Sequence, residues 1–222
     1  FGGSQTEVDT TYTISAWPPA VAARVAKAMA RQGFRLFKVK VGVPPPLPSG
    51  HPLPRGVAGR TKKCDRASDG RESVSGPGPK ARAGVRVKRF EEDLRRVEAV
   101  VKAVPGCEVI LDANQGFKGS QALAFVKSCE RKRIPSLALE QPVPKNDHRG
   151  LAQLTKTCPI PVLADESVMG PEDAVRLVAN KEAKMINIKL AKSGVLQALQ
   201  ILAIAKASGL DLMIGCMAES KI

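Results

Sequence analysis

Aromatic residues, histidines and cysteines are scarce in this sequence of 222 residues. Phe, Trp and Tyr together make up 4% of the chain, so aliphatic side chains must fill any core. The five cysteines are odd in number and form no Cys-x-x-Cys spacing, which argues against a disulfide framework or a zinc knuckle and favours a reducing compartment. His51 and His148 have no partner at metal-ligand spacing.

Long apolar runs and a leader segment are also missing. No run of about 18 apolar residues occurs, so we expect no membrane span. No signal peptide is visible, which predicts a cytoplasmic protein. The chain begins with Phe1 rather than Met, so we expect it to be cut from a longer protein, and a lost organellar targeting segment remains an alternative.

The positive charge is concentrated in one segment. Residues 43–88 hold ten Lys and Arg against three Asp and Glu, so this stretch carries +7 of the formal net charge of +14. The segment 43–87 has no hydrophobic periodicity and is rich in Pro, Gly, Ser and Arg, a composition that predicts a disordered insertion. A basic tail that binds nucleic acid is the alternative. It is disfavoured because no aromatic residue is interleaved for base stacking.

Outside that insertion, strand and helix signals alternate strictly. Such alternation implies parallel strands joined by right-handed crossovers, in either a doubly wound sheet or a barrel. We expect strands at 11–15, 37–41, 108–112, 137–140, 161–165, 185–189 and 211–216, and helices at 18–32, 88–104, 120–131, 147–155, 171–180 and 194–207.

Polar residues end successive predicted strands at regular intervals. Asp112 and Glu140 are 28 residues apart, Glu140 and Asp165 are 25 apart, and Asp165 and Lys189 are 24 apart. Equal βα units favour a barrel, whose catalytic groups lie at the carboxyl ends of the strands. The interval from Lys40 to Asp112 is 72 residues, and the surplus falls on the insertion. The sequence therefore predicts a partial barrel domain from 1–42 and 88–222.

Two lysines on one predicted strand are candidate general bases. Lys38 and Lys40 are two residues apart, so their side chains point to the same face of the strand. In a barrel interior, like charge and burial would lower a lysine pKa, and such a lysine can take a proton near neutral pH. The alternative is an exposed edge strand with solvated lysines.

Three carboxylates indicate a metal site. Asp112, Glu140 and Asp165 end three successive strands and would repel one another unless a cation neutralised them. Oxygen ligands without His or thiolate select Mg²⁺, or alternatively Mn²⁺. Each carboxylate alone could instead cap a helix. Lys189 ends the next strand with Asn187 on the same face, so lysines on both sides of the metal could deprotonate a carbon from either face.

An ordered set of motifs resembles the mandelate racemase/muconate-lactonizing group of the enolase superfamily. Within that group, residues 10–15 and 187–194 are most similar to dipeptide epimerases that act on L-Ala-D/L-Glu. The resemblance implies an incomplete α/β barrel of the enolase C-terminal type, with about seven strands and without the capping domain and the eighth strand. The motifs are Lys38-Val39-Lys40, Leu111-Asp112-Ala113-Asn114-Gln115-Gly116, Glu140-Gln141-Pro142, Ala164-Asp165-Glu166-Ser167, Asn187-Ile188-Lys189 and Gly215-Cys216-Met217-Ala218-Glu219-Ser220.

The resemblance also implies roles for individual residues. Lys40 and Lys189 would be the two bases, with Lys38 lowering the pKa of its neighbour. The Mg²⁺ ligands would be Asp112, Glu140 and Asp165, supported by Asn114, Glu166 and Asn187, and Glu219 would hydrogen-bond the substrate carboxylate.

The implied reaction is an epimerisation or racemisation. The enzyme, an isomerase, would abstract the α-proton of a carboxylate substrate, an L-Ala-D/L-Glu-type dipeptide, through an enediolate. Two alternatives stay open: a muconate cycloisomerase-like or other enolase-superfamily enzyme, and a catalytically inactive truncated fragment. The full-length enzyme is compatible with a homo-oligomer.

Overall fold

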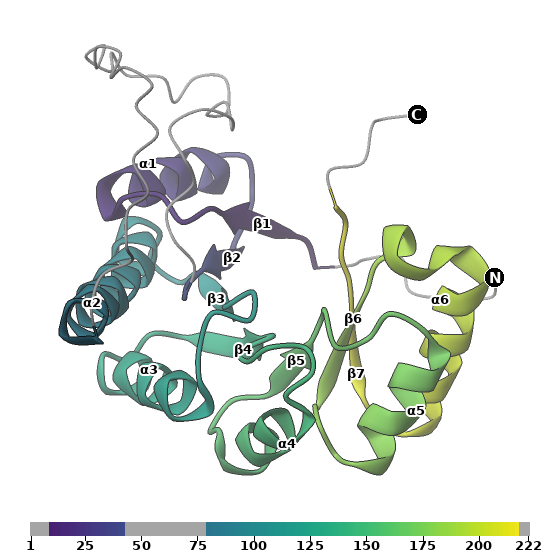
Figure 1. The fold of residues 1–222 in the computed structure, drawn as a ribbon. Helices are drawn as coiled ribbons and strands as arrows, with labels where there is room; N and C mark the ends of the chain where they lie inside the picture. Colours follow the sequence, from purple (N-terminus) through teal and green to yellow (C-terminus); the bar gives the residue numbers. More distant parts are fainter. Residues whose placement is uncertain (1–8, 43–78, 218–222) are drawn as a thin grey trace, which may run out of the picture.

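Seven parallel strands alternate with six helices in this computed structural model, which describes residues 9–42 and 79–217 (Figure 1). The predicted alternation is confirmed, and most boundaries agree within two residues. The strands are β1 (Thr11–Ile14), β2 (Leu36–Lys40), β3 (Glu108–Asp112), β4 (Ser136–Glu140), β5 (Val162–Ala164), β6 (Met185–Ile188) and β7 (Asp211–Ile214). The helices are α1 (Pro19–Ala30), α2 (Pro79–Ala103), α3 (Gly119–Arg131), α4 (His148–Thr157), α5 (Pro171–Ala179) and α6 (Leu190–Ala207).

The sheet order distinguishes a barrel from a doubly wound sheet. Each strand pairs in parallel with the next strand in the sequence, in the order β1-β2-β3-β4-β5-β6-β7. A doubly wound sheet would instead reverse its order at a switch point. Figure 1 shows the helices arranged around the outside of the curved sheet. The fold is therefore an open α/β barrel arc, as predicted.

Two helices begin four or more residues earlier than expected. Helix α2 starts at Pro79 rather than at residue 88, because proline suits a first helical position and good helix formers such as Ala81 and Arg82 follow. The rest of the predicted insertion, 43–78, lies outside the described residues, so its disorder remains a prediction. Helix α6 starts at Leu190 rather than at residue 194. Gly194 interrupts it with a φ of 71°, a conformation that glycine adopts without steric cost.

Two separate apolar clusters hold the helices against the sheet. The larger cluster packs α1 to α4 on the first strands through residues such as Phe37, Leu111 and Phe125. The second cluster packs α5 and α6 on the later strands through residues such as Leu177 and Ile186. Burial of these side chains stabilises the packing of the helices on the strands that carry the candidate residues. None of the helices in the described part is long and apolar enough to cross a membrane.

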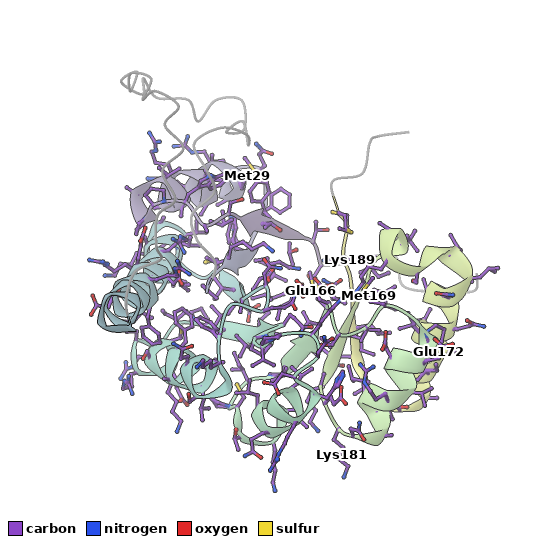
Figure 2. The ribbon with its side chains drawn as sticks, in the orientation of Figure 1. Met29, Glu166, Met169, Glu172, Lys181 and Lys189 are labelled. Atoms are coloured by element: carbon purple, nitrogen blue, oxygen red, sulfur yellow. The ribbon has the colours of Figure 1, made fainter. Side chains whose placement is uncertain are left out.

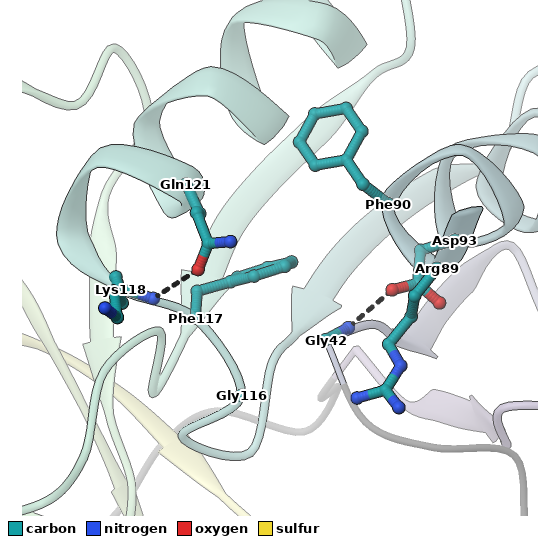
Figure 3. A pocket seen from close by; sticks show the side chains of 8 residues that line it. All are labelled: Gly42, Arg89, Phe90, Asp93, Gly116, Phe117, Lys118 and Gln121. Carbon is teal, nitrogen blue, oxygen red and sulfur yellow. Dashed lines mark hydrogen bonds between the residues drawn. The ribbon is translucent and has the colours of Figure 1, made fainter. Parts of the chain in front are cut away.

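A buried ion pair fixes α2 to the end of β2. Asp93 and Arg96 are each 1% exposed. Asp93 Oδ2 accepts a 2.7 Å hydrogen bond from Gly42 N, which Figure 3 shows, and burial raises the pKa of the Asp93 carboxyl. The Arg96 guanidinium bonds Asp93 and donates to the main-chain oxygens of Trp17 and Lys40. The strand that carries Lys40 is thereby held from outside the sheet.

Candidate active site

The strand register brings the candidate residues to one end of the sheet. Lys40 pairs with Asp112, and Asp112 pairs with Glu140, at the carboxyl ends of β2, β3 and β4. Asp165 and Lys189 directly follow β5 and β6. Figure 2 places Lys189 near the middle of the molecule, where the strands end. The carboxyl ends of the strands are where barrel enzymes carry their active sites.

The two lysines of β2 are bound to the first two carboxylates. Lys38 Nζ lies 2.9 Å from Oε1 and 2.6 Å from Oε2 of Glu140. Lys40 Nζ lies 2.6 Å from Asp112 Oδ2 and also donates to Asn114 Oδ1. Because β2 pairs with a strand on each side and Lys38 is 6% exposed, the alternative of an edge strand with solvated lysines is wrong.

Two lysines from the β6 unit hold the third carboxylate. Lys189 Nζ lies 2.5 Å from Asp165 Oδ2, and Lys192 Nζ lies 3.0 Å from Oδ1. Burial alone would raise the Asp165 pKa, but the bond from Lys189 and the charge of Lys192 hold it below its usual value. Burial opposes the charge on Lys189, yet its bond to Asp165 raises the Lys189 pKa overall. In this arrangement Lys189 is therefore an ammonium group.

Glu140 lies at the centre of the cluster and is fully buried. Burial first, and then the nearby Asp112 charge, raises the pKa of Glu140 to about 7 although Lys38 opposes both effects. Asn187 Nδ2 donates a 2.8 Å bond to Glu140 Oε1. In the part of the chain that the structure describes, Asn187 Oδ1 is buried without a hydrogen-bond partner, and Glu140 Oε2 faces only the Lys38 ammonium at 2.6 Å. A buried amide oxygen without a donor beside this carboxylate indicates a site for a cation or a polar substrate group.

Asn114 and Glu166 connect the β3 and β5 units. Asn114 Nδ2 donates a 3.1 Å bond to Glu166 Oε1, and Asn114 N bonds Asp112 Oδ1 at 3.1 Å. Asn114 has a φ of 40°, a left-handed conformation that asparagine tolerates. Glu166 Oε2, like Asn187 Oδ1, is buried without a hydrogen-bond partner among the described residues. The structure thus brings together every predicted site residue except Glu219, which lies outside the described residues.

The donor set fits a hard divalent cation, although it is not assembled into a cage. Within residues 9–42 and 79–217, no three His, Cys, Asp or Glu side chains are arranged to hold a metal ion together. Four lysines instead balance four carboxylates: Lys38, Lys40, Lys189 and Lys192 against Asp112, Glu140, Asp165 and Glu166. The carboxylate oxygens, together with the unpaired Asn187 Oδ1, are the ligand type that Mg²⁺ prefers. The residues therefore fit the ion once the lysines release their carboxylates.

Sequence reasoning missed two residues of this cluster, Gln141 and Lys192. Lys192 donates to Asp165 O and Asn187 O, both at 2.8 Å, in addition to its bond to the Asp165 carboxylate. The expected helix began at residue 194, so the earlier turn that brings Lys192 to the strand ends was not foreseen. Gln141 appeared only within a motif, because its amide reveals no chemistry without its partners.

Two cavities lie away from the cluster. One of about 230 Å³ lies between α2, α3 and the strand-end loops and is lined by Gly42, Arg89, Phe90, Asp93, Gly116, Phe117, Lys118 and Gln121 (Figure 3). Another of about 610 Å³ is lined by Asp9, Thr10, Gln32 to Leu36, Gly106, Glu108 and Leu137. Neither contains a candidate base or carboxylate, so the chemistry of the cluster, and not a cavity, identifies the site.

A Gly215→Ala variant is expected to lose about 1–3 kcal/mol of unfolding free energy by overpacking. A Cβ at this position would lie 2.5 Å from Asn187 Oδ1 and 3.0 Å from Lys189 Cε. Asn187 is fully buried and bonded to Glu140, so it cannot move away cheaply. Urea denaturation measures the effect. Gly119→Ala is the control, because a Cβ there meets nothing within 4 Å, and equal stability of both variants would contradict the prediction.

Comparison with known proteins gives one consistent family. A family model described as enolase C-terminal domain-like matches residues 20–222. An aromatic dipeptide epimerase from Herpetosiphon aurantiacus is 34% identical over 99% of this chain and 49% of its own length. An L-Ala-D/L-Glu epimerase from Thermotoga maritima is 32% identical over 100% of this chain and 51% of its own.

A solved structure agrees with these relatives. The dipeptide epimerase from Enterococcus faecalis, complexed with Mg and the dipeptide L-Leu-L-Tyr, is similar with a TM-score of 0.74 and 29% identity. The similarity covers 99% of this chain and 49% of that one. The chain thus spans about half the length of the curated relatives it matches.

Proposed function

This chain belongs to the enolase C-terminal domain-like family, and we propose that it acts in the Mg²⁺-dependent epimerisation of a dipeptide of the L-Ala-D/L-Glu type. The observation that carries the proposal is the order of the strand ends. Strand β2 carries Lys40 and strand β6 leads directly into Lys189. These two strands flank β3, β4 and β5, which end in or lead directly into the three carboxylates. Relatives named as epimerases, which are isomerases, support the reaction class, and a similar epimerase structure with Mg and a dipeptide supports the ion and the substrate.

In this proposal the two lysines exchange protons with opposite faces of the substrate carbon. Lys40 and Lys189 approach the carboxylate cluster from strands on its two sides. One neutral lysine removes the α-proton, and the ammonium of the other donates a proton from the opposite face, so the carbon inverts. The lysine that acts as base must first leave its carboxylate partner and release a proton to solvent, because an ammonium group has no lone pair. The other lysine stays protonated. Lys38, on the same face as Lys40, is proposed as its charged neighbour.

The carboxylates are proposed as the ion's ligands. Asp112, Glu140 and Asp165 would hold Mg²⁺, or alternatively Mn²⁺, with Asn114, Glu166 and Asn187 supporting them through the hydrogen bonds described above. When bound, the ion supplies positive charge that stabilises the negative charge developing on the substrate carboxylate. Glu219 is proposed to hydrogen-bond the substrate.

The test is α-hydrogen exchange in D₂O. We expect the chain, with Mg²⁺ and L-Ala-L-Glu, to replace the α-proton of the glutamate residue by deuterium and to form the second epimer, as followed by ¹H NMR. Chelation with EDTA should stop both processes. A chain that unfolds cooperatively but exchanges neither L-Ala-L-Glu nor an aromatic or hydrophobic dipeptide would contradict the proposal and support the inactive-fragment alternative.

A further inference from the structure

Gln141 is a fully buried amide between two of the proposed metal ligands. It directly follows Glu140 and has a φ of 34°, which turns its backbone out of the β4 ladder. Its N–H still bonds Leu163 O on β5 at 2.8 Å. Its carbonyl, however, points to the other neighbour and accepts a 2.7 Å bond from Gln115 N in the loop after β3. The backbone of Gln141 therefore joins the β3 and β5 units on either side of it.

The Gln141 side chain supplies the hydrogen-bond acceptor that the turned backbone carbonyl no longer offers to β5. In a regular parallel ladder the carbonyl of Gln141 would accept from Asp165 N, the next amide along β5. Here the side-chain Oε1 accepts from Asp165 N at 3.0 Å, and also from Ser167 N at 3.0 Å. Nε2 donates to Val143 O at 3.0 Å and to Ser167 Oγ at 2.8 Å. Both N–H groups and both lone pairs of the amide are used.

Few other backbone contacts hold Asp165 in place. Strand β5 has three residues and pairs with β4 and β6 through only two residue pairs each. We propose that Gln141 is a positioning residue that fixes the Asp165 carboxylate relative to Glu140 and Asp112, acting through the Asp165 backbone. This inference rests on the proposed function, because it assigns Gln141 a role in the geometry of the Mg²⁺ site.

Both the length and the hydrogen-bonding groups of the side chain require glutamine at this position. Asparagine is one methylene shorter, so from the same backbone its oxygen cannot reach the Asp165 amide. Glutamate would place an oxygen correctly but lacks the two N–H groups that Val143 O and Ser167 Oγ accept from. Leucine fills the volume but leaves the Asp165 and Ser167 amides unbonded in a buried place.

Magnesium chloride titrations of the wild-type chain, Gln141→Asn and Gln141→Leu test the proposal. We expect Mg²⁺ binding, measured by calorimetry, to weaken about 10- to 100-fold in both variants, the range for loss of a side chain that orients a metal ligand. Val25→Ala, which removes fully buried side-chain atoms from α1, is the control for lost stability alone. It should bind Mg²⁺ as the wild type does.

Each outcome decides the inference. Folded Gln141 variants that bind Mg²⁺ as tightly as the wild type would overturn it and leave the proposed function intact. A wild-type chain that binds no Mg²⁺ would remove the proposed metal site and this inference together. If both Gln141 variants fail to fold, Ser167→Ala decides, because it removes the hydroxyl bond that orients the amide and so loosens the contact between Oε1 and the Asp165 amide. Intermediate Mg²⁺ affinity supports the proposal, and wild-type affinity overturns it.

Discussion

A Lys189→Met variant should interconvert the two dipeptide epimers about 10²- to 10⁴-fold more slowly than the wild type, the usual contribution of a positioned general base. The loss of α-proton exchange should affect only one of the two epimers. Lys40 on β2 remains, so exchange of the α-proton with D₂O should persist for one epimer and disappear for the other. Methionine keeps the length of the side chain in a position next to buried Asn187 and Gly215, so packing changes little.

The exchange is followed by ¹H NMR with each pure epimer, and Lys40→Met should show the opposite preference. Lys184→Met is the matched control, because Lys184 is exposed and precedes the other end of the same strand. Its rates should equal those of the wild type. Equal loss for both epimers in Lys189→Met would argue against bases on opposite faces and would assign Lys189 only to the charge balance of Asp165.

An Arg96→Met variant is expected to lose about 3–5 kcal/mol of unfolding free energy at neutral pH, the usual cost of removing one partner of a buried ion pair. Asp93 would keep a buried charge that only Gly42 N satisfies, and the carbonyls of Trp17 and Lys40 would lose their donor. The loss of unfolding free energy should be smaller at acidic pH. Burial already raises the pKa of Asp93 in the folded state, and removal of Arg96 raises it further, so protonation as the pH falls relieves the variant.

Urea denaturation at neutral and mildly acidic pH measures both effects. Arg95→Met is the matched control, because Arg95 is the neighbouring residue of α2 but is exposed, and its replacement should change stability little. A loss in Arg96→Met that stays constant with pH would show that the cost comes from packing rather than from the unpaired Asp93 charge. Loss of the anchor at the end of β2 should also displace Lys40.

The sequence predicted the order of the elements and the convergence of the site because both depend on local patterns. Lys40, Asp112 and Glu140 end their strands, and parallel pairing of successive strands makes them neighbours without further information. The chemistry of the site was likewise readable, since three carboxylates and flanking lysines are recognisable residue types. The roles assigned to these residues remain predictions that the variants above test.

What sequence reasoning missed depends on tertiary contacts. The significance of Gln141 comes from a positive φ that turns its carbonyl toward Gln115, and no residue pattern reveals that turn. Lys192 joins the site because α6 begins before Gly194, where a glycine would ordinarily indicate a helix boundary. The direct lysine–carboxylate bonds were also not predicted. The three carboxylates were expected to bind a cation, and the lysines were expected to lie around that cation and not to bind the carboxylates themselves.

The two apolar clusters that pack the helices meet at the short strand β5. The first includes Val162 and the second begins at Ala164, while Leu163 between them belongs to a third, smaller cluster with Ile110 and Ala138. Local opening between such units costs less than global unfolding. Asp112 and Glu140 lie on strands packed by the first cluster, and Asp165 and Lys189 lie beside strands packed by the second. A subglobal opening along β5 would therefore disrupt the small third cluster and separate the candidate site residues while the two larger clusters stay folded.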